Sequence, residues 1–169
     1  MNITVIVIEI IILTALFTAA VLWGSKNPVD TVYDMPQPLI DRCLELGLID
    51  ETKKADSKET KLKKLTAALM AALILALVLF FVNGAENFIQ GFFVSYIIWL
   101  VIDWYDCFVI DWGFVCHSKK VIIPGTEDLM DSYKDYKFHA IGSLKGMALG
   151  LPVCVLVGLL VQVINWIVR

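Results

Sequence analysis

The stretch FIQGFFVSYIIWLVIDWYDCFVI, residues 88–110, decides the fold that this chain is predicted to adopt. Its first part is almost wholly apolar, and an α-helix needs about 20 such residues to cross roughly 30 Å of hydrocarbon. Acidic residues then follow at Asp103 and Asp106, with Asp111 just beyond the end of the stretch. The pattern predicts a transmembrane helix whose last turns carry carboxylates.

Three further stretches are long and apolar enough to cross a membrane: residues 3–23, 65–82 and 139–167. The whole composition agrees, because 59% hydrophobic and 18% charged residues do not suit a soluble fold of this length. The first stretch is longer than a signal-peptide core, so we expect it to be retained. We predict an all-α integral membrane protein, one domain over residues 1–169, built as a four-transmembrane-helix bundle with short cytoplasmic interfacial helices.

The distribution of basic residues predicts the orientation of the chain. Twelve of the 14 Lys and Arg lie in the connections 24–64 and 111–138, and the short link 83–87 has none. The positive-inside rule then places both connections in the cytoplasm and both termini outside it. We expect the plasma membrane of a prokaryote. The net charge of −3 argues against a nucleic-acid partner, because phosphate binding needs a surplus of cations.

The connections also predict local structure. Apolar residues at helical spacing over 39–46 indicate a short amphipathic helix that ends at Gly47. The sequence IPGTED, residues 123–128, predicts a turn at Pro-Gly and a helix with Thr126 as its N-cap, extending to about Lys137. Because the link after 65–82 is so short, that helix and the next are expected to form a tight antiparallel hairpin.

The carboxylates late in the 88–110 stretch are the main functional signal. Residues 88–102 span roughly 22 Å of helix, so Asp103 should lie within the hydrocarbon and Asp106 near its boundary. At about 100° per residue these two side chains share one side of the helix. Acids buried in lipid need a partner, a cation or water, so we expect this side to face the bundle.

The fourth stretch offers a surface that could receive these acids. Glycines repeat in it at four-residue spacing: Gly142, Gly146 and Gly150. Such spacing permits close helix packing, either inside the bundle or between copies. His139 and Lys145 flank the glycines, and the depth of Lys145 in the membrane matches that of Asp103. The sequence therefore predicts an Asp103–Lys145 ion pair.

Two alternatives remain open for these polar residues. One takes five side chains as metal ligands or acid–base groups: Asp103, Asp106, Asp111, His117 and His139. The first two and His139 could together hold Mg, Mn or Zn, although no HExxH motif, phosphate-binding loop or nucleophile elbow accompanies them. A plain charge contact between packed helices explains the same residues. Glu9 lies roughly 10 Å deep in the first helix. It either snorkels to the outer headgroups or faces inward on a proton or cation path toward Asp103.

These observations favour a membrane protein that binds or transports a small molecule, lipid or ion, or serves as an accessory component. Its polar site would lie at the cytoplasmic ends of helices 88–110 and 139–167. Expected partners are membrane lipid and either a second copy or another membrane subunit; the identity of any cofactor is left open. The alternatives are a membrane enzyme acting on a lipid or isoprenoid, with or without a metal, and a structural assembly protein.

Overall fold

The structure, a computed structural model, describes residues 2–50 and 58–169. Helix makes up 80% of it, and the described residues contain no strand, which confirms the all-helical prediction. The α-helices are α1 (Ile3–Gly24), α2 (Gln37–Glu45), α3 (Lys58–Phe81), α4 (Phe88–Tyr105), α5 (Met130–Tyr133) and α6 (Tyr136–Val168). The π-helix η3 (Asp106–Val115) continues α4, and η1 (Pro28–Asp34) and η4 (Lys119–Val121) are short 3₁₀ helices.

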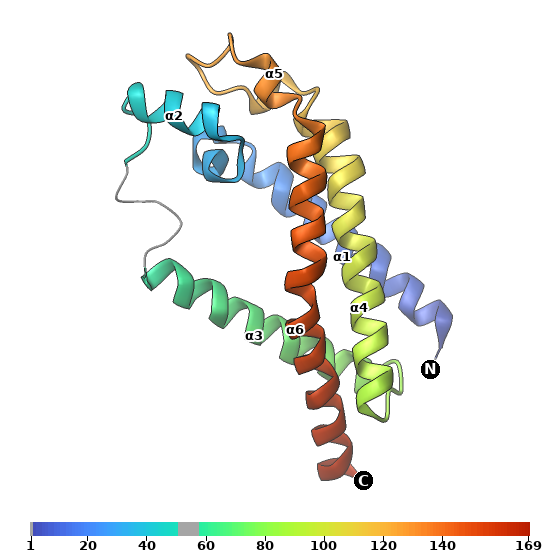
Figure 1. The fold of residues 1–169 in the computed structure, drawn as a ribbon. Coiled ribbons are helices and arrows are strands. Elements are labelled where there is room, and N and C mark those ends of the chain that lie inside the picture. Colours follow the sequence, from blue (N-terminus) through green and yellow to red (C-terminus); the bar gives the residue numbers. More distant parts are fainter. Residues whose placement is uncertain (1, 51–57) are drawn as a thin grey trace.

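The long axis of the molecule is formed by α4 with η3 and, alongside them, α6 (Figure 1). Near the C-terminal end of α6 the two helices touch through glycines. A Cβ added at Gly158 would lie 2.8 Å from the carbonyl oxygen of Phe88, and one at Gly91 would lie 3.0 Å from Val161. Because the first of these contacts is with backbone, any side chain at Gly158 would push the helices apart. Neither glycine belongs to the 142/146/150 repeat that was predicted to pack helices.

The winding of α4 changes at Asp106. From there to Val115 the helix is a π-helix, and its last turn is closed by Cys116 N–H donating to the carbonyl oxygen of Asp111 at 2.9 Å. Residues five apart are joined by backbone hydrogen bonds in a π-helix and lie toward one side of it, whereas in an α-helix they lie about 140° apart. Asp111 therefore joins Asp106 on the side that faces α6. The prediction of uniform α-helix over 88–110 was wrong in this respect.

The helices α1 and α3 cross the α4–α6 pair instead of running parallel to it (Figure 1). Small side chains on α3, Ala72 and Ala76, are buried in a core shared with α6, and α3 packs mainly against that helix. Gly84, with a φ of +69°, turns the chain between α3 and α4. The predicted side-by-side hairpin of 65–82 and 88–110 was therefore wrong, because the small face of α3 packs across α6.

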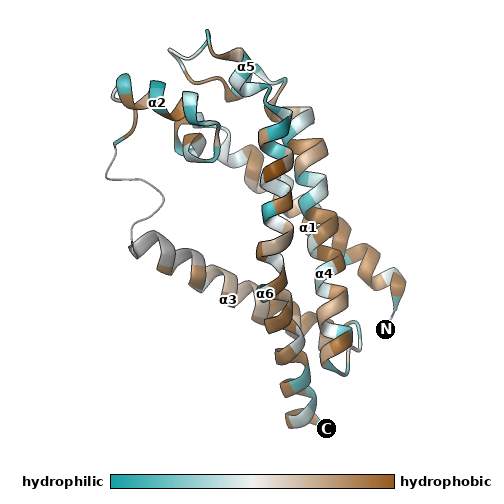
Figure 2. Cartoon of the chain, viewed as in Figure 1, coloured by the Kyte–Doolittle hydropathy of each residue, from teal (hydrophilic) through white to brown (hydrophobic). Residues whose placement is uncertain are grey.

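Among the described residues, three helical segments are long and apolar enough to cross a membrane: Ile3–Gly24, Phe88–Val115 and Met130–Val168. The predicted stretch 65–82 corresponds to a shorter apolar segment, Leu65–Phe81. Within α1, every residue of which is described, none is buried, and Leu16 is 62% exposed. Figure 2 shows α1 hydrophobic over most of its length. A large apolar surface thus lies outside the core of the molecule.

Residues 28–49 of the first long connection pack with the second connection into a cap at one end of the α4–α6 pair (Figure 1). Ile40 and Cys43 of α2 share a small core with Ile123 of the second connection. Arg42 donates two hydrogen bonds of 3.0 Å to the carboxylate of Asp128. The amphipathic helix predicted over 39–46 is confirmed as α2, which is followed by Gly47 at a φ of +66°.

One detail of the second connection differs from its prediction. Gly125 has a φ of +90°, as a Pro-Gly turn requires, but Thr126 is not an N-cap. Its side chain is fully buried, donates to the carbonyl oxygen of Ile123 at 2.7 Å and lies 2.8 Å from the hydroxyl of Tyr133. The expected helix is reduced to the short α5, and a new helix, α6, begins before Lys137.

Candidate functional site

A cavity of about 730 Å³ lies among α1, η1, α6 and the junction of α4 with η3. Asp103, Asp106 and Asp111 line it from α4 and η3, and His139 lines it from α6. We call it the acidic cavity. The structure thus brings together four of the polar residues that the sequence had singled out: Asp103, Asp106, Asp111 and His139.

The best-defined contact of the acidic cavity joins Asp111 and His139. The Nδ1 of His139 lies 3.1 Å from a carboxylate oxygen of Asp111, and the two side chains are 7% and 22% exposed. The Nε2 of His139 is buried and has no hydrogen-bond partner in the described part of the chain. Because Asp111 engages Nδ1, Nε2 is the ring nitrogen that stays unpaired.

Asp103 packs against a glycine of α6 instead of a cation. Its carboxylate occupies the place where a Cβ at Gly146 would be, and its Oδ2 is buried without a partner among the described residues. Lys145 is exposed, so the predicted Asp103–Lys145 ion pair is not formed. The reason is geometric: Lys145 lies about 100° around α6 from Gly146, so it turns away when Gly146 faces α4.

The glycines of α6 have different surroundings. The indole of Trp99 covers Gly150, and its Nε1 donates to the carbonyl oxygen of Gly146 at 3.1 Å. At Gly142, which lines the acidic cavity, an added Cβ would meet no described atom within 4 Å. Gly146 and Gly150 therefore make room for side chains of α4, whereas Gly142 faces open space.

The geometry gives a metal site no support. Within residues 2–50 and 58–169, no group of three or more His, Cys, Asp or Glu side chains is placed to hold a metal ion. Asp103, Asp106 and His139 line one cavity without forming such a group. Burial, with a smaller contribution from Asp111, raises the pKa of Cys116 to about 11, so this thiol stays protonated and is a poor ligand.

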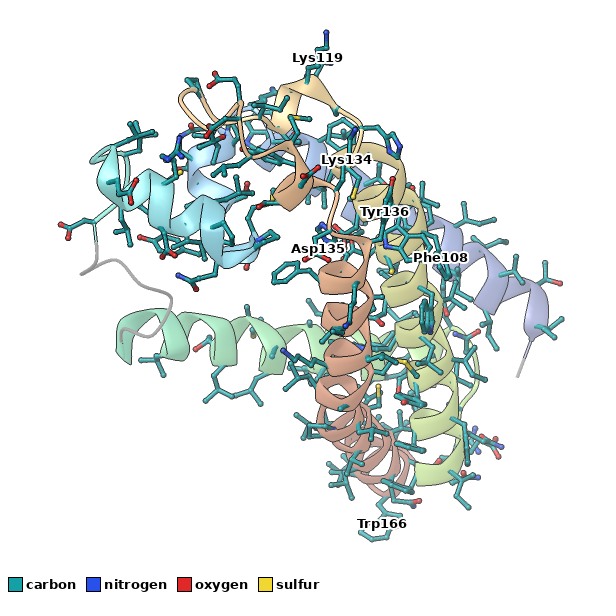
Figure 3. The ribbon with its side chains drawn as sticks, turned by 45° about the horizontal axis from the view of Figure 1, so that its top comes forward. Phe108, Lys119, Lys134, Asp135, Tyr136 and Trp166 are labelled. Atoms are coloured by element: carbon teal, nitrogen blue, oxygen red, sulfur yellow. The ribbon has the colours of Figure 1, made fainter. Side chains whose placement is uncertain are left out.

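His117, the other histidine weighed as a ligand, belongs to an exposed aromatic row outside the acidic cavity. Its Nδ1 lies 2.7 Å from the carbonyl oxygen of Trp112, and its ring lies near that of Tyr136. Phe108 extends the row, with its ring centre 5.1 Å from that of Trp112 (Figure 3). Such a row suits the interface between lipid and water.

Glu9 lies away from the acidic cavity, in the wall of a second cavity of about 520 Å³ that we call the apolar cavity. One carboxylate oxygen of Glu9 accepts a hydrogen bond of 2.6 Å from the side chain of Asn83. The other oxygen is buried with no partner in the described ranges. Glu9 therefore faces inward and does not snorkel. Nothing in the spacing of the sequence pointed to Asn83 as its partner.

The geometry of the acidic cavity defines what it can do chemically. Carboxylates bind cations through charge-assisted hydrogen bonds, and a histidine with one free ring nitrogen can accept or donate a proton. No protein-family model, curated protein or solved structure matches this chain.

Proposed function

We propose that this chain is an integral membrane protein that binds a positively charged small molecule or ion in the acidic cavity, for transport or as an accessory component. The chain has four spans, both termini outside the cytoplasm and the cavity at the cytoplasmic end, in the plasma membrane of a prokaryote. The observation that carries the proposal is the gathering of Asp103, Asp106 and Asp111 around one cavity beside the free Nε2 of His139.

The helices support insertion into a membrane. Besides the segments long enough to span, Leu65–Phe81 covers about 26 Å at 1.5 Å per residue, close to the roughly 30 Å of the hydrocarbon core. A bilayer can thin locally to accommodate so small a mismatch. Lys119, in the basic second connection, and Trp166 lie at opposite ends of the molecule (Figure 3). This suits a chain with a basic cytoplasmic end and an aromatic residue at the other interface.

The charge of the acidic cavity selects the ligand class. Its described lining includes Asp34 of η1 as well as the carboxylates of α4 and η3, and it includes no Lys or Arg. Lys145, which could have neutralised Asp103, is exposed instead. In a site of low dielectric constant, a nearby positive charge strongly stabilises the charged form of a carboxylate. A cation is therefore the ligand whose binding would satisfy this wall.

Ligand binding can be tested with three probes of one size and different charge. Butylammonium, butanol and butyrate are added to the purified protein in lipid nanodiscs, and thermal unfolding is followed. We expect butylammonium to stabilise the protein, by about 2.7 kcal/mol at a concentration of 100 times its Kd. Asp106→Asn should weaken this effect, and Asp131→Asn, an exposed residue of α5 outside the cavity, should not.

Equal stabilisation by butylammonium and butanol would contradict the proposal, because the charge would then play no part. So would an unchanged response of Asp106→Asn, because the carboxylate that lines the cavity would not contribute to binding.

The number of spans can be tested separately by labelling single cysteines from each side of the membrane in a background without the native cysteines. With four spans, Asn2→Cys and Glu86→Cys react from the same, outer face. With α1, α4 and α6 as the spans and α3 on the surface, these two positions lie on opposite sides. In the four-span topology Lys119→Cys lies on the cytoplasmic face and Glu86→Cys on the outer face. Labelling of both from the same face would contradict that topology.

A conducting or carrier role for so few helices would need a second copy or a partner membrane subunit. The outer surface of α1 is available for it, since Ile11 is 61% and Leu16 62% exposed. We expect Ile11→Cys to form crosslinks between chains in native membranes. Monomeric Ile11→Cys under oxidation, together with adducts at Gly142→Cys, would place the contact on α6 instead.

A membrane enzyme that acts on a lipid or isoprenoid at the cytoplasmic interface is the second candidate. The contact of Asp111 with His139 favours it, because a carboxylate that orients one ring nitrogen leaves the other as a general base. Incubation with a membrane lipid extract, followed by mass spectrometry, separates the candidates. An enzyme changes the extract and His139→Gln abolishes the change, whereas a binding protein leaves it unaltered. Stoichiometric Mg, Mn, Zn or Fe in the purified protein would support the metal-dependent version.

A further inference from the structure

We propose that the ligand is an amphiphile with a basic head and a single hydrocarbon chain, whose head occupies the acidic cavity and whose chain occupies the apolar cavity. This inference rests on the proposed function, since it requires the acidic cavity to bind a cation. It adds the chemical class of the ligand and a second binding region, which lies among α1, α3, α4 and α6.

The two cavities follow one another along the same helices. On α1, Leu13 lines the apolar cavity and Phe17 lines the acidic cavity, four residues or about 6 Å further along. On α4, Ile102 lines the first and Asp103, the next residue, lines the second. The two cavities are therefore neighbours, and residues that line the apolar cavity lie within about one helical turn of Asp103.

The walls of the apolar cavity suit hydrocarbon and do not suit a hydrated ion. Most of its polar side chains make hydrogen bonds within the protein. Ser95 donates to a backbone carbonyl oxygen at 3.0 Å, Trp99 donates to that of Gly146, and one oxygen of Glu9 accepts from Asn83. The other oxygen of Glu9 has no partner among the described residues, and one such atom is too few to hold water. Water enters a cavity only where several polar groups can receive it. A cation path from Glu9 to Asp103 through this space is therefore disfavoured, and an alkyl chain is favoured.

The acidic head region and the apolar region have different effects on binding. A chain that moves from lipid into a protein cavity gains little, because lipid tails are about as apolar as the side chains that replace them. Selection must therefore come from the head, where carboxylates favour a cation and disfavour an anion. A volume of about 520 Å³ lies at the lower end of the range of ligand pockets, which is consistent with one chain.

Trp99 lines the apolar cavity and reports directly on a chain within it. The other tryptophans are replaced by Phe, and the protein is placed in nanodiscs with a dodecylamine that carries bromine atoms on its chain. Bromine quenches indole fluorescence at contact. We expect saturable quenching of Trp99 by the brominated amine and little by the brominated dodecanoate of the same chain. Asp106→Asn should shift the amine titration to higher concentration.

A variant that fills the apolar cavity tests the place of the chain. Ala72 is 2% exposed and lines the cavity from α3, so Ala72→Phe should abolish quenching of Trp99 while butylammonium still binds. Ala67→Phe, at an exposed position of the same helix outside the cavity, is the matched control. Trp99 in this variant should be quenched as strongly as in the parent protein. Should Ala72→Phe fail to fold, Ala71→Phe fills the same wall from a more exposed position.

The outcomes separate the inference from the proposed function. If butylammonium binds but the brominated amine does not quench Trp99, the inference is overturned and the proposed function stands. If butylammonium does not bind, both fall. If the amine and the carboxylate quench equally, or if Ala72→Phe and Ala67→Phe quench alike, the chain reaches Trp99 as ordinary membrane lipid and the inference is overturned.

Discussion

The two ends of the α4–α6 pair are built on opposite principles. At one end Gly158 meets the backbone of Phe88, and the helices are in contact. At the other end η3 and α6 border a cavity of about 730 Å³, and polar side chains face it. The glycine contact fixes the helices relative to each other, so the cavity end can keep polar atoms unpaired without loss of the fold. Such a division is expected where a binding site departs from optimal packing.

The largest effect should come from breaking the contact end. Gly158→Ala places a Cβ 2.8 Å from the carbonyl oxygen of Phe88, and such overpacking costs about 1–3 kcal/mol. Unfolding of the purified protein by denaturing detergent measures the loss. Gly142→Ala is the control, because its Cβ meets no described atom within 4 Å, and it should gain roughly 0.5–1 kcal/mol from better helix propensity. Equal effects of the two substitutions would contradict the comparison.

The next effect should be seen at the cavity end, in a double-mutant cycle on Asp111 and His139. The contact of 3.1 Å between them should give a coupling free energy of about 1–2 kcal/mol, because each single substitution leaves the other side chain without its partner. The same unfolding assay applied to Asp111→Ala, His139→Ala and the double variant measures it. Additive effects would show that the pair is not formed in the membrane.

Lys145 should contribute much less. Since it is exposed and forms no ion pair with Asp103 in the described structure, Lys145→Met should change the free energy of unfolding by no more than about 0.5 kcal/mol. Breaking a buried ion pair would instead cost about 3–5 kcal/mol. A loss of that size would restore the pair predicted from the sequence and contradict the packing of Asp103 on Gly146.

The smallest effect is expected in the cap. A hydrogen bond from Arg42 lowers the pKa of Asp128 below its ordinary value of 3.8, so Arg42→Gln should raise that pKa. A lowered carboxyl pKa stabilises the fold above pH 3.8, and this stabilisation is lost as the pH falls through the lowered pKa. An NMR titration of the Asp128 carboxyl checks the shift, with Asp131 as an internal reference. An unchanged Asp128 pKa would show that the two connections are not joined in solution.

Local patterns in the sequence predicted much of the fold. Apolar runs indicated the long helices, helical spacing over 39–46 indicated α2, and Pro-Gly indicated the turn at Gly125. These features depend on neighbours along the chain, so they are readable from sequence. The crossing of α3 over α6 depends on which helix packs against the face of α3 that carries Ala72. No local pattern in the sequence encodes that choice.

The polar residues that the sequence singled out lie near one another, but their contacts differ from the predicted ones. Asp103, Asp106 and His139 do line one cavity. Their partners were missed because the side that a residue faces was counted at about 100° per residue, which holds for an α-helix and fails in η3. The same rule, applied to α6, would have shown that Lys145 turns away when Gly146 faces α4.

The π-helical winding of η3 makes it a joint between the cavity and the cap. If residues 106–115 were wound as an α-helix with their number unchanged, Asp111 would lie about 140° around the helix from Asp106. Asp111 would leave His139, and the connection that carries Asp128 would swing away from Arg42. A change of one hydrogen-bonding register in the backbone would thus act on the ligand cavity and on the cytoplasmic cap together.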